Sequence, residues 1–301
     1  MIDLSKYPEP VRLLALCHLS GVTPRAFDML FHHLGSLENI LQSDREVFEQ
    51  IDGITEDLAE RASEASGRLD EAAVMYRSLR EREIAVIDRF APGYPVRWFE
   101  LHDPPPLVFV RGRLPDPALK TVTLVGAGEA SVEGMALTSR MAKTFAEHGV
   151  QVVSSLVGGN DMAAHLACKT AGGQSFAVLE AGFDQIGRKD LMPVAIDIAN
   201  TGGVISEYMP DTEPSDLTPA ESNRLMSGLG QAVVITEVYE SSSRILDILV
   251  CCREIGKLVF FVIDPEHGAL ADESSLATAI ENGAVPLAGF DKVGDIIKTL
   301  V

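Results

Sequence analysis

Two glycine-rich turns, each preceded by an apolar run typical of a buried strand, constrain this sequence most. The first lies within 121–131 and the second within 151–165, about 30 residues further along the chain. Small residues at a helix start let backbone N–H groups approach an anion, and the helix dipole favours negative charge there. A right-handed crossover between the two strands would place both turns at one edge of a parallel sheet. The pattern therefore favours a nucleotide or a nucleic-acid backbone as ligand.

The sequence from residue 121 onward alternates strand and helix patterns. Strands are predicted at 121–126, 151–156, 175–179, 204–208, 232–238, 258–263 and 285–288. These runs are rich in Val and Ile, as buried strands are. Helices between such apolar strands predict a parallel sheet that is covered on both faces. The predicted fold class is therefore α/β with a Rossmann-like parallel sheet, and the first two of these strands should be adjacent and parallel.

Residues 1–84 are predicted to form a small all-helical domain of the SAM or helix-hairpin-helix type. Apolar residues recur at helical spacing in 11–19, 26–34 and 69–79. The break IDGIT resembles the hairpin of a helix-hairpin-helix unit, although a plain helix–helix turn is the favoured interpretation. A short strand at 83–88 and a proline-rich stretch follow. The predicted domains are thus 1–84 and a Rossmann-like domain at 85–301, with 85–120 joining the two.

Composition limits the choice of ligand and compartment. The chain has 44 Asp and Glu against 25 Lys and Arg, a formal net charge of -19, whereas phosphate binding usually depends on a basic surface. The N-terminus lacks a signal-peptide pattern and no apolar run approaches 18 residues, so we expect a cytoplasmic protein without membrane contact. Four cysteines form no C-x-x-C pair and are expected to be buried, reduced thiols: Cys17, Cys168, Cys251 and Cys252.

Several segments together resemble the DNA-processing protein A family, also called the Smf family. The stretch GYPVRWFELHDPPPLVFVRGRL is followed in family order by LVGAGEASVEG, VVSSLVGGNDMAAHLA, SFAVLEAGFD, GGVISEYMP and SNRLMSGLGQAVVITEV. Members of this family bind single-stranded DNA in bacterial transformation and load the RecA recombinase. The resemblance therefore implies a non-enzymatic protein that binds single-stranded DNA or a nucleotide, forms a homo-oligomer and has a RecA-type recombinase as partner. Many members carry a winged-helix domain after this region. We do not expect that domain in this chain, which stops at Val301.

The chain departs from the family pattern where an anion pocket is implied. Ala-Gly at 127–128 stands where the family has Ser-Arg, and Val-Gly-Gly-Asn-Asp at 157–161 replaces Ala-Arg-Gly-Ile-Asp. Ser-Asn-Arg at 222–224 replaces Arg-Asn-Arg. Arginine is the strong bidentate phosphate ligand, and glycine cannot supply its charge. The resemblance thus implies a degenerate pocket with weakened DNA binding.

The candidate phosphate-binding residues lie in these turns and at nearby helix starts. They are Gly126, Gly128, Ser131, Gly158, Gly159, Asn223, Arg224, Ser242 and Ser243. Backbone N–H groups and the Ser131 hydroxyl would contact the anion, and Arg224, at the start of its helix, is the retained family arginine. Two alternatives stay open: Ser131 could simply cap a helix, and Arg224 could face solvent.

Carboxylates near the turns add further hypotheses. Asp161 is predicted to cap a helix that runs to residue 171, with His165 one turn away on the same face. Acid–base catalysis by this pair would need a nucleophile or metal that the sequence does not reveal, so we assign no catalytic residue, metal or cofactor. Glu207 and Glu237 end two strands and could hold a ribose hydroxyl or cap a loop. A nucleotide sensor, a nucleotide-processing enzyme and a protein-interaction partner without DNA binding remain alternatives.

Overall fold

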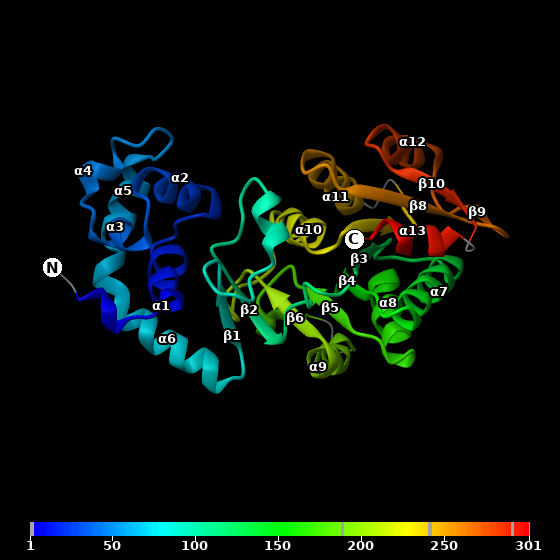
Figure 1. Ribbon diagram of the computed structural model, residues 1–301, viewed down its shortest axis with the longest axis horizontal. Helices are drawn as coiled ribbons and strands as arrows, with labels where there is room; N and C mark the ends of the chain where they lie inside the picture. The colour runs from blue at the N-terminus through cyan, green and yellow to red at the C-terminus, as the bar shows by residue number, and fades with distance from the viewer. Residues whose placement is uncertain (1–2, 188–189, 240–242, 290–291, 301) are drawn as a thin grey trace. The chain divides into compact units, whose positions relative to one another are not determined.

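The computed structural model describes residues 3–187, 190–239, 243–289 and 292–300 (Figure 1). The chain divides into two compact units, Met1–Val110 and Arg111–Val301. The domain boundary expected after residue 84 marks a change of sequence pattern and stays a prediction. No described helix has the length and apolar character needed to cross a bilayer.

The first unit consists of short helices followed by an antiparallel pair of strands. Its α-helices are α1 (Glu9–Leu13), α2 (Pro24–Leu34), α3 (Leu37–Gln42), α4 (Arg45–Phe48), α5 (Glu56–Ser63) and α6 (Leu69–Glu81). The hydroxyls of Thr23, Ser36 and Thr55 accept backbone N–H bonds at the starts of α2, α3 and α5, so side-chain caps fix these helix ends. In the IDGIT segment Gly53 adopts a left-handed conformation between α4 and α5. Strands β1 (Ala85–Asp88) and β2 (Leu107–Gly112) then pair antiparallel.

The second unit is built on a mostly parallel sheet, which confirms the predicted α/β fold. Its strands are β3 (Thr121–Val125), β4 (Gln151–Ser155), β5 (Ser175–Val178), β6 (Gly203–Ser206), β7 (Ala232–Ile235), β8 (Leu258–Asp264), β9 (Gly268–Ala269) and β10 (Val285–Ala288). All seven predicted strands are present, and five end one to three residues earlier than expected. The short β9, which pairs antiparallel with β8, was not predicted.

Strand order in this unit is β6-β5-β4-β3-β7-β8-β10. β3 and β4 are adjacent and parallel with Thr121 opposite Gln151, as predicted. Strands β4, β5 and β6 are added in turn on one side of β3. The next strand, β7, then pairs with β3 on its other side. This reversal is a topological switch point, where open α/β sheets form a crevice at the carboxyl ends of their strands. Both glycine turns leave the sheet at that edge.

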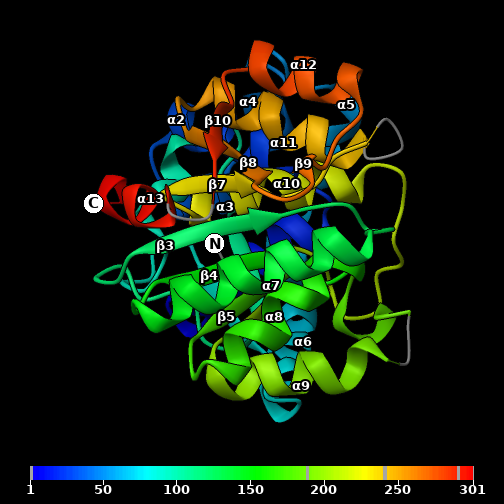
Figure 2. The same ribbon diagram turned by 90° about the vertical axis from the view of Figure 1, so that its right-hand side faces the viewer.

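Helices cover both faces of the sheet. Figure 2 shows α7 (Val132–Glu147), α8 (Gly159–Thr170) and α9 (Leu191–Thr201) on one face, with α10 (Thr218–Leu229), α11 (Ser243–Glu254) and α12 (Glu273–Glu281) on the other. On α7, Leu137, Met141 and Phe145 recur every four residues and are fully buried against the sheet. The last helix, α13 (Val293–Thr299), joins the same core. This packing holds the helix starts rigidly above the two turns.

Candidate anion site at the carboxyl edge of the sheet

The two glycine turns pack directly against each other. The backbone N–H of Asn160 donates to the carbonyl of Ala127 at 3.3 Å. Gly159 has φ +51°, and a Cβ there would lie 2.3 Å from the carbonyl oxygen of Gly128. A Cβ on Gly126 would lie 2.2 Å from the side-chain nitrogen of Asn160. Two of the predicted phosphate-binding glycines are therefore required by the close approach of the turns themselves.

Gly128 and Gly158 have different surroundings. Gly128 is exposed, and a Cβ there would meet only a methyl of Val157 at 3.9 Å. Gly158 is buried and has φ +133°, a conformation that L-residues rarely adopt. An arginine, which the family resemblance implies at both positions, therefore fits the backbone at Gly128 and would be strained at Gly158.

The start of α7 faces a carboxylate of the chain itself. Glu237, which follows β7, is fully buried. Its Oε1 accepts the backbone N–H of Ser131 at 3.1 Å, and its Oε2 accepts the Asn160 amide at 2.8 Å. The hydroxyl of Ser131 accepts the N–H of Gly134 at 2.9 Å and so caps the helix. Of the donors that were predicted to bind an anion at this turn, the Ser131 N–H therefore binds a carboxylate of the protein.

Asn160 connects the two turns and Glu237, a role that our sequence reasoning missed. It is fully buried, and its Oδ1 has no hydrogen-bond partner among the described residues. The available signal was an asparagine at a position where the family resemblance implies isoleucine. A buried amide needs polar partners, so this substitution indicated a polar contact inside the turn.

Asp161 does not cap α8, contrary to the prediction. The helix begins after Gly158 without a side-chain cap and ends at Thr170. The Asp161 carboxylate lies in the first turn of the helix, where it accepts the hydroxyl of Ser154 at 3.0 Å and forms a short hydrogen bond with the hydroxyl of Ser155. The buried Ser155 hydroxyl needs an acceptor, which explains why Asp161 turns toward the sheet.

His165 lies behind the second turn, away from any exposed surface. It is 1% exposed, and its Nε2 lies 2.8 Å from the carbonyl oxygen of Ser155. Burial lowers the pKa of His165, although the Ser155 carbonyl and the Asp161 charge oppose the shift. The residue is thus a neutral, enclosed imidazole, and it meets Asp161 through the shared neighbour Ser155.

Arg224 lies near the middle of α10, not at its start as predicted. Its side chain is 9% exposed, and its Nη2 donates to both oxygens of Glu207 at 2.6 Å. The alternative of a solvent-facing arginine is therefore wrong. Glu207 neutralises the retained family arginine, so replacing Arg224 would test folding as well as any ligand contact. Neighbouring Asn223 is also buried.

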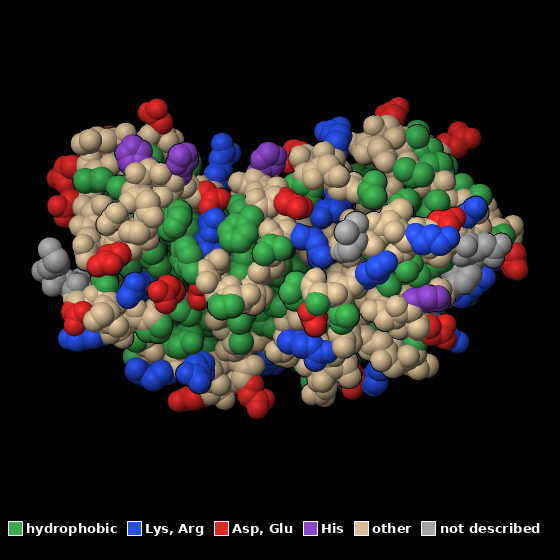
Figure 3. Space-filling model, viewed as in Figure 1, with side chains coloured by type: hydrophobic (Ala, Val, Ile, Leu, Met, Phe, Trp, Pro, Cys, Tyr) green, Lys and Arg blue, Asp and Glu red, His purple; other side chains and the backbone are tan. Residues whose placement is uncertain are grey.

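The remaining candidates and the charge distribution complete the site. Ser242 lies outside the described residues, and Ser243 is the first residue of α11. On the face shown in Figure 3, several Lys and Arg side chains lie near one another around α13. No group of three or more His, Cys, Asp or Glu arranged for a metal occurs among the described residues. All four cysteines are free thiols; Cys168 and Cys252 are buried, as predicted, and the other two are half-buried.

Comparison with known proteins assigns the family. A family model described as DNA recombination-mediator protein A matches residues 85–299. The chain belongs to this family. The match includes both glycine turns, Glu237 and the Arg224–Glu207 pair, so the carboxyl edge of the sheet is part of the region that defines this recombination-mediator family.

Curated relatives in the recombination-mediator family are moderately similar to the chain. Protein Smf of Synechocystis sp. is 24% identical over 280 residues, which cover 92% of this chain and 69% of that protein. DNA processing protein DprA of Streptococcus pneumoniae is 30% identical over 171 residues, which cover 56% of this chain and 59% of that protein. The match to DprA of Bacillus subtilis covers 65% of that protein, so the chain spans less than two thirds of several relatives.

Solved structures confirm the fold of this family member. The X-ray structure of DprA from Streptococcus pneumoniae matches with a TM-score of 0.77 at 22% identity, covering 97% of this chain and 98% of that one. A structure of DNA processing protein A from Helicobacter pylori, which concerns its single-stranded DNA binding mode, matches with a TM-score of 0.61 at 19% identity. That match covers 73% of this chain and 98% of the Helicobacter pylori chain.

Proposed function

We propose that this DNA-processing family member is a non-catalytic protein that binds single-stranded DNA during DNA uptake or recombination. The binding surface is the carboxyl edge of β3 and β4, and its affinity for DNA is low because carboxylates occupy the two turns. Family membership and the DNA binding described for the Helicobacter pylori protein support the ligand class. The contact of Glu237 with the start of α7 carries the argument for low affinity.

The contact between Glu237 and the start of α7 opposes DNA binding for electrostatic reasons. A phosphate that approaches the α7 start would come close to Glu237, and two like charges about 5 Å apart repel by roughly 3 kcal/mol at an effective dielectric constant near 20. The Ser131 N–H is already bonded to that carboxylate, so the phosphate would gain no donor there in compensation. A net charge of -19 adds long-range repulsion.

The test is to restore one arginine where the backbone accepts it. Gly128→Arg adds a bidentate phosphate ligand at an exposed position with open space around it. Titration of fluorescent oligothymidine at low salt should show an affinity gain of about tenfold, corresponding to about 1.4 kcal/mol, with a steeper salt dependence. Gly158→Arg is unsuitable because of its positive φ.

A matched control separates local binding from added charge. Gly67→Arg places the same charge on an exposed glycine of the helical unit, where a Cβ would meet no atom within 4 Å. An equal gain in both variants, or tight DNA binding by the unmodified chain, would contradict the proposal. Thermal stabilisation by a mononucleotide without any DNA binding would instead support the nucleotide-sensor alternative. Partnership with a RecA-type recombinase and homo-oligomer formation stay predictions.

A further inference from the structure

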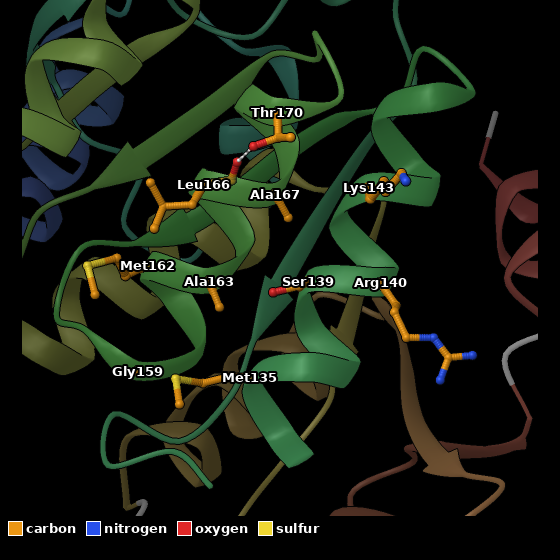
Figure 4. A pocket seen from close by; sticks show the side chains of 10 residues that line it. All are labelled: Met135, Ser139, Arg140, Lys143, Gly159, Met162, Ala163, Leu166, Ala167 and Thr170. Atoms are coloured by element: carbon orange, nitrogen blue, oxygen red, sulfur yellow. Dashed lines mark hydrogen bonds between the residues drawn. The ribbon is translucent and has the colours of Figure 1, made fainter. Parts of the chain in front are cut away.

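An apolar cleft lies on the outer side of the helix pair α7 and α8. Its volume is about 500 Å³. Figure 4 shows Met135 and Ser139 of α7 and Ala163 and Ala167 of α8 pointing into the space between the two helices, whereas Met162 and Leu166 extend from the far side of α8. Leu166 is 43% exposed, which is high for a leucine on a helix that otherwise packs against the core. The cleft plays no part in the anion site described above, although Gly159 of the second turn lines one end of it.

The floor of the cleft is a linear furrow. Ala163 and Ala167 are four residues apart on α8 and so lie on one face of that helix, and Gly159 lines the end of the furrow next to the first turn. At 1.5 Å per residue, the three positions span about 12 Å. Small side chains along one line let the backbone of another helix approach closely, as ridges pack into grooves. The flexible side chains of Met135 and Met162 can adapt to the apolar residues of such a helix.

Charge is present on only one rim of the cleft. Its two charged lining residues, Arg140 and Lys143, are both cationic and both lie on α7, in a chain with 44 acidic against 25 basic residues. In Figure 4 Arg140 extends outward from α7, away from α8. The Nζ of Lys143 lies 3.8 Å from Oε1 of Glu147, and both side chains are more than half exposed. This ion pair is therefore weak, and an acidic group of a partner can replace Glu147. The opposite rim, with Met162 and Leu166, is apolar.

We propose that this cleft is a docking groove for an amphipathic α-helix of a partner protein. Apolar residues of the partner, spaced by three or four positions, fill the furrow between α7 and α8. Acidic residues on one flank of the partner helix face Arg140 and Lys143. The linear shape of the furrow and the one-sided positive charge together select this occupant and its orientation. This docking is independent of DNA binding at the carboxyl edge of the sheet.

Two designed helical peptides test the groove on the full-length chain. Both carry leucines at positions i, i+3, i+4 and i+7, and they differ only in a flank of glutamates or of lysines. Fluorescence anisotropy at low salt should show the glutamate peptide binding at least about tenfold more tightly than the lysine peptide. The double variant Arg140→Glu/Lys143→Glu should reverse this preference. Leu166→Asp should weaken the glutamate peptide by about tenfold or more.

Matched controls make the outcome decisive. Ile280→Asp introduces the same charge at a 48% exposed apolar residue of α12, on the opposite face of the sheet, and should leave peptide binding unchanged. Thermal melting of each variant checks that the fold is intact. Equal affinity for both peptides, or equal loss from Leu166→Asp and Ile280→Asp, would overturn the proposal. Binding of decanoate in the cleft without binding of either peptide would overturn it in favour of a small amphipathic anion.

Discussion

The first glycine turn, between β3 and α7, and the second, between β4 and α8, lie side by side and use glycine for different physical reasons. In the first turn Gly128 is exposed, has an ordinary backbone conformation and touches little. In the second turn Gly158 and Gly159 both have positive φ, and Gly159 presses on the backbone of the first turn. Glycine is therefore dispensable at Gly128, whereas the second turn depends on it.

The carboxylates that fill the two turns also differ in origin. Glu237 follows β7, which neighbours β3 in the sheet but is far from it in sequence. It accepts a hydrogen bond from the N–H of Ser131, which is 106 residues away in sequence. Asp161 fills the second turn locally, through Ser154 and Ser155 at separations of seven and six residues. The first turn is thus closed by the tertiary fold and the second by its own segment. The two turns should consequently respond differently to substitution.

The largest expected effect is the loss of glycine in the second turn. Gly159→Ala places a Cβ 2.3 Å from a backbone oxygen at a φ of +51°, so the two turns must separate. We expect the free energy of unfolding to fall by about 3 kcal/mol, which combines backbone strain with the clash. Gly128→Ala in the first turn should change it by less than about 0.5 kcal/mol. Urea denaturation of both variants measures the difference, and equal losses would show that the turns are equivalent.

The next effect compares the two carboxylates. Glu237→Ala leaves the Ser131 N–H and the Asn160 amide without their acceptor in a buried site, so we expect a loss of about 2 kcal/mol. Asp161→Ala should cost about 1 kcal/mol, because the Ser154 hydroxyl still has the Leu124 carbonyl at 2.7 Å as acceptor.

The affinity for DNA provides a second measurement of the difference between Glu237 and Asp161. Removing Glu237 also removes the negative charge at the α7 start, so affinity for oligothymidine should rise several-fold. Removing Asp161, whose carboxylate is enclosed by Ser154 and Ser155, should leave affinity nearly unchanged. If Glu237→Ala lost stability without any gain in DNA affinity, the carboxylate would act only as a structural cap.

Sequence reasoning recovered the parts of this molecule that depend on local pattern. Val-rich and Ile-rich runs located the strands, and the handedness of crossovers placed β3 beside β4. The pairing of Arg224 with Glu207 was not accessible, because no local rule says which buried charges meet across different elements. The true start of α10 was indicated by Pro219, since proline favours the first turn of a helix. A strand as short as β9 has no periodicity to detect.

Long-range side-chain contacts set the chemistry of the candidate site, and these lay beyond the sequence. The carboxylate of Glu237 was correctly located at a strand end, but its hydrogen bonds to Ser131 and Asn160 require the folded sheet. The glycine pattern alone indicated an open anion site. The structure shows that the same pattern also serves two turns that pack on each other.

The smallest expected effect is a pH dependence that belongs to the second turn. Burial lowers the pKa of His165 below its ordinary value of 6.5, so below that pH the unfolded chain binds a proton that the folded chain does not. The stability contributed by neutral His165 is therefore present above pH 6.5 and is lost as the pH falls below it. Stability should therefore decrease as the pH is lowered from 7 to 5.5.

His165→Gln isolates this contribution, because glutamine can keep a hydrogen bond to the Ser155 carbonyl without titrating. In urea denaturation, the variant should lose less stability than the wild-type protein between pH 7 and pH 5.5. Half-buried His18 in the first unit, with its pKa lowered to about 4 by desolvation, should supply part of the remaining pH dependence in both proteins. If the free energy of unfolding depended on pH equally in the variant and the wild-type protein, the second turn would open enough for His165 to be protonated in the folded protein. The contrast between a rigid second turn and the replaceable Gly128 of the first turn would then fail.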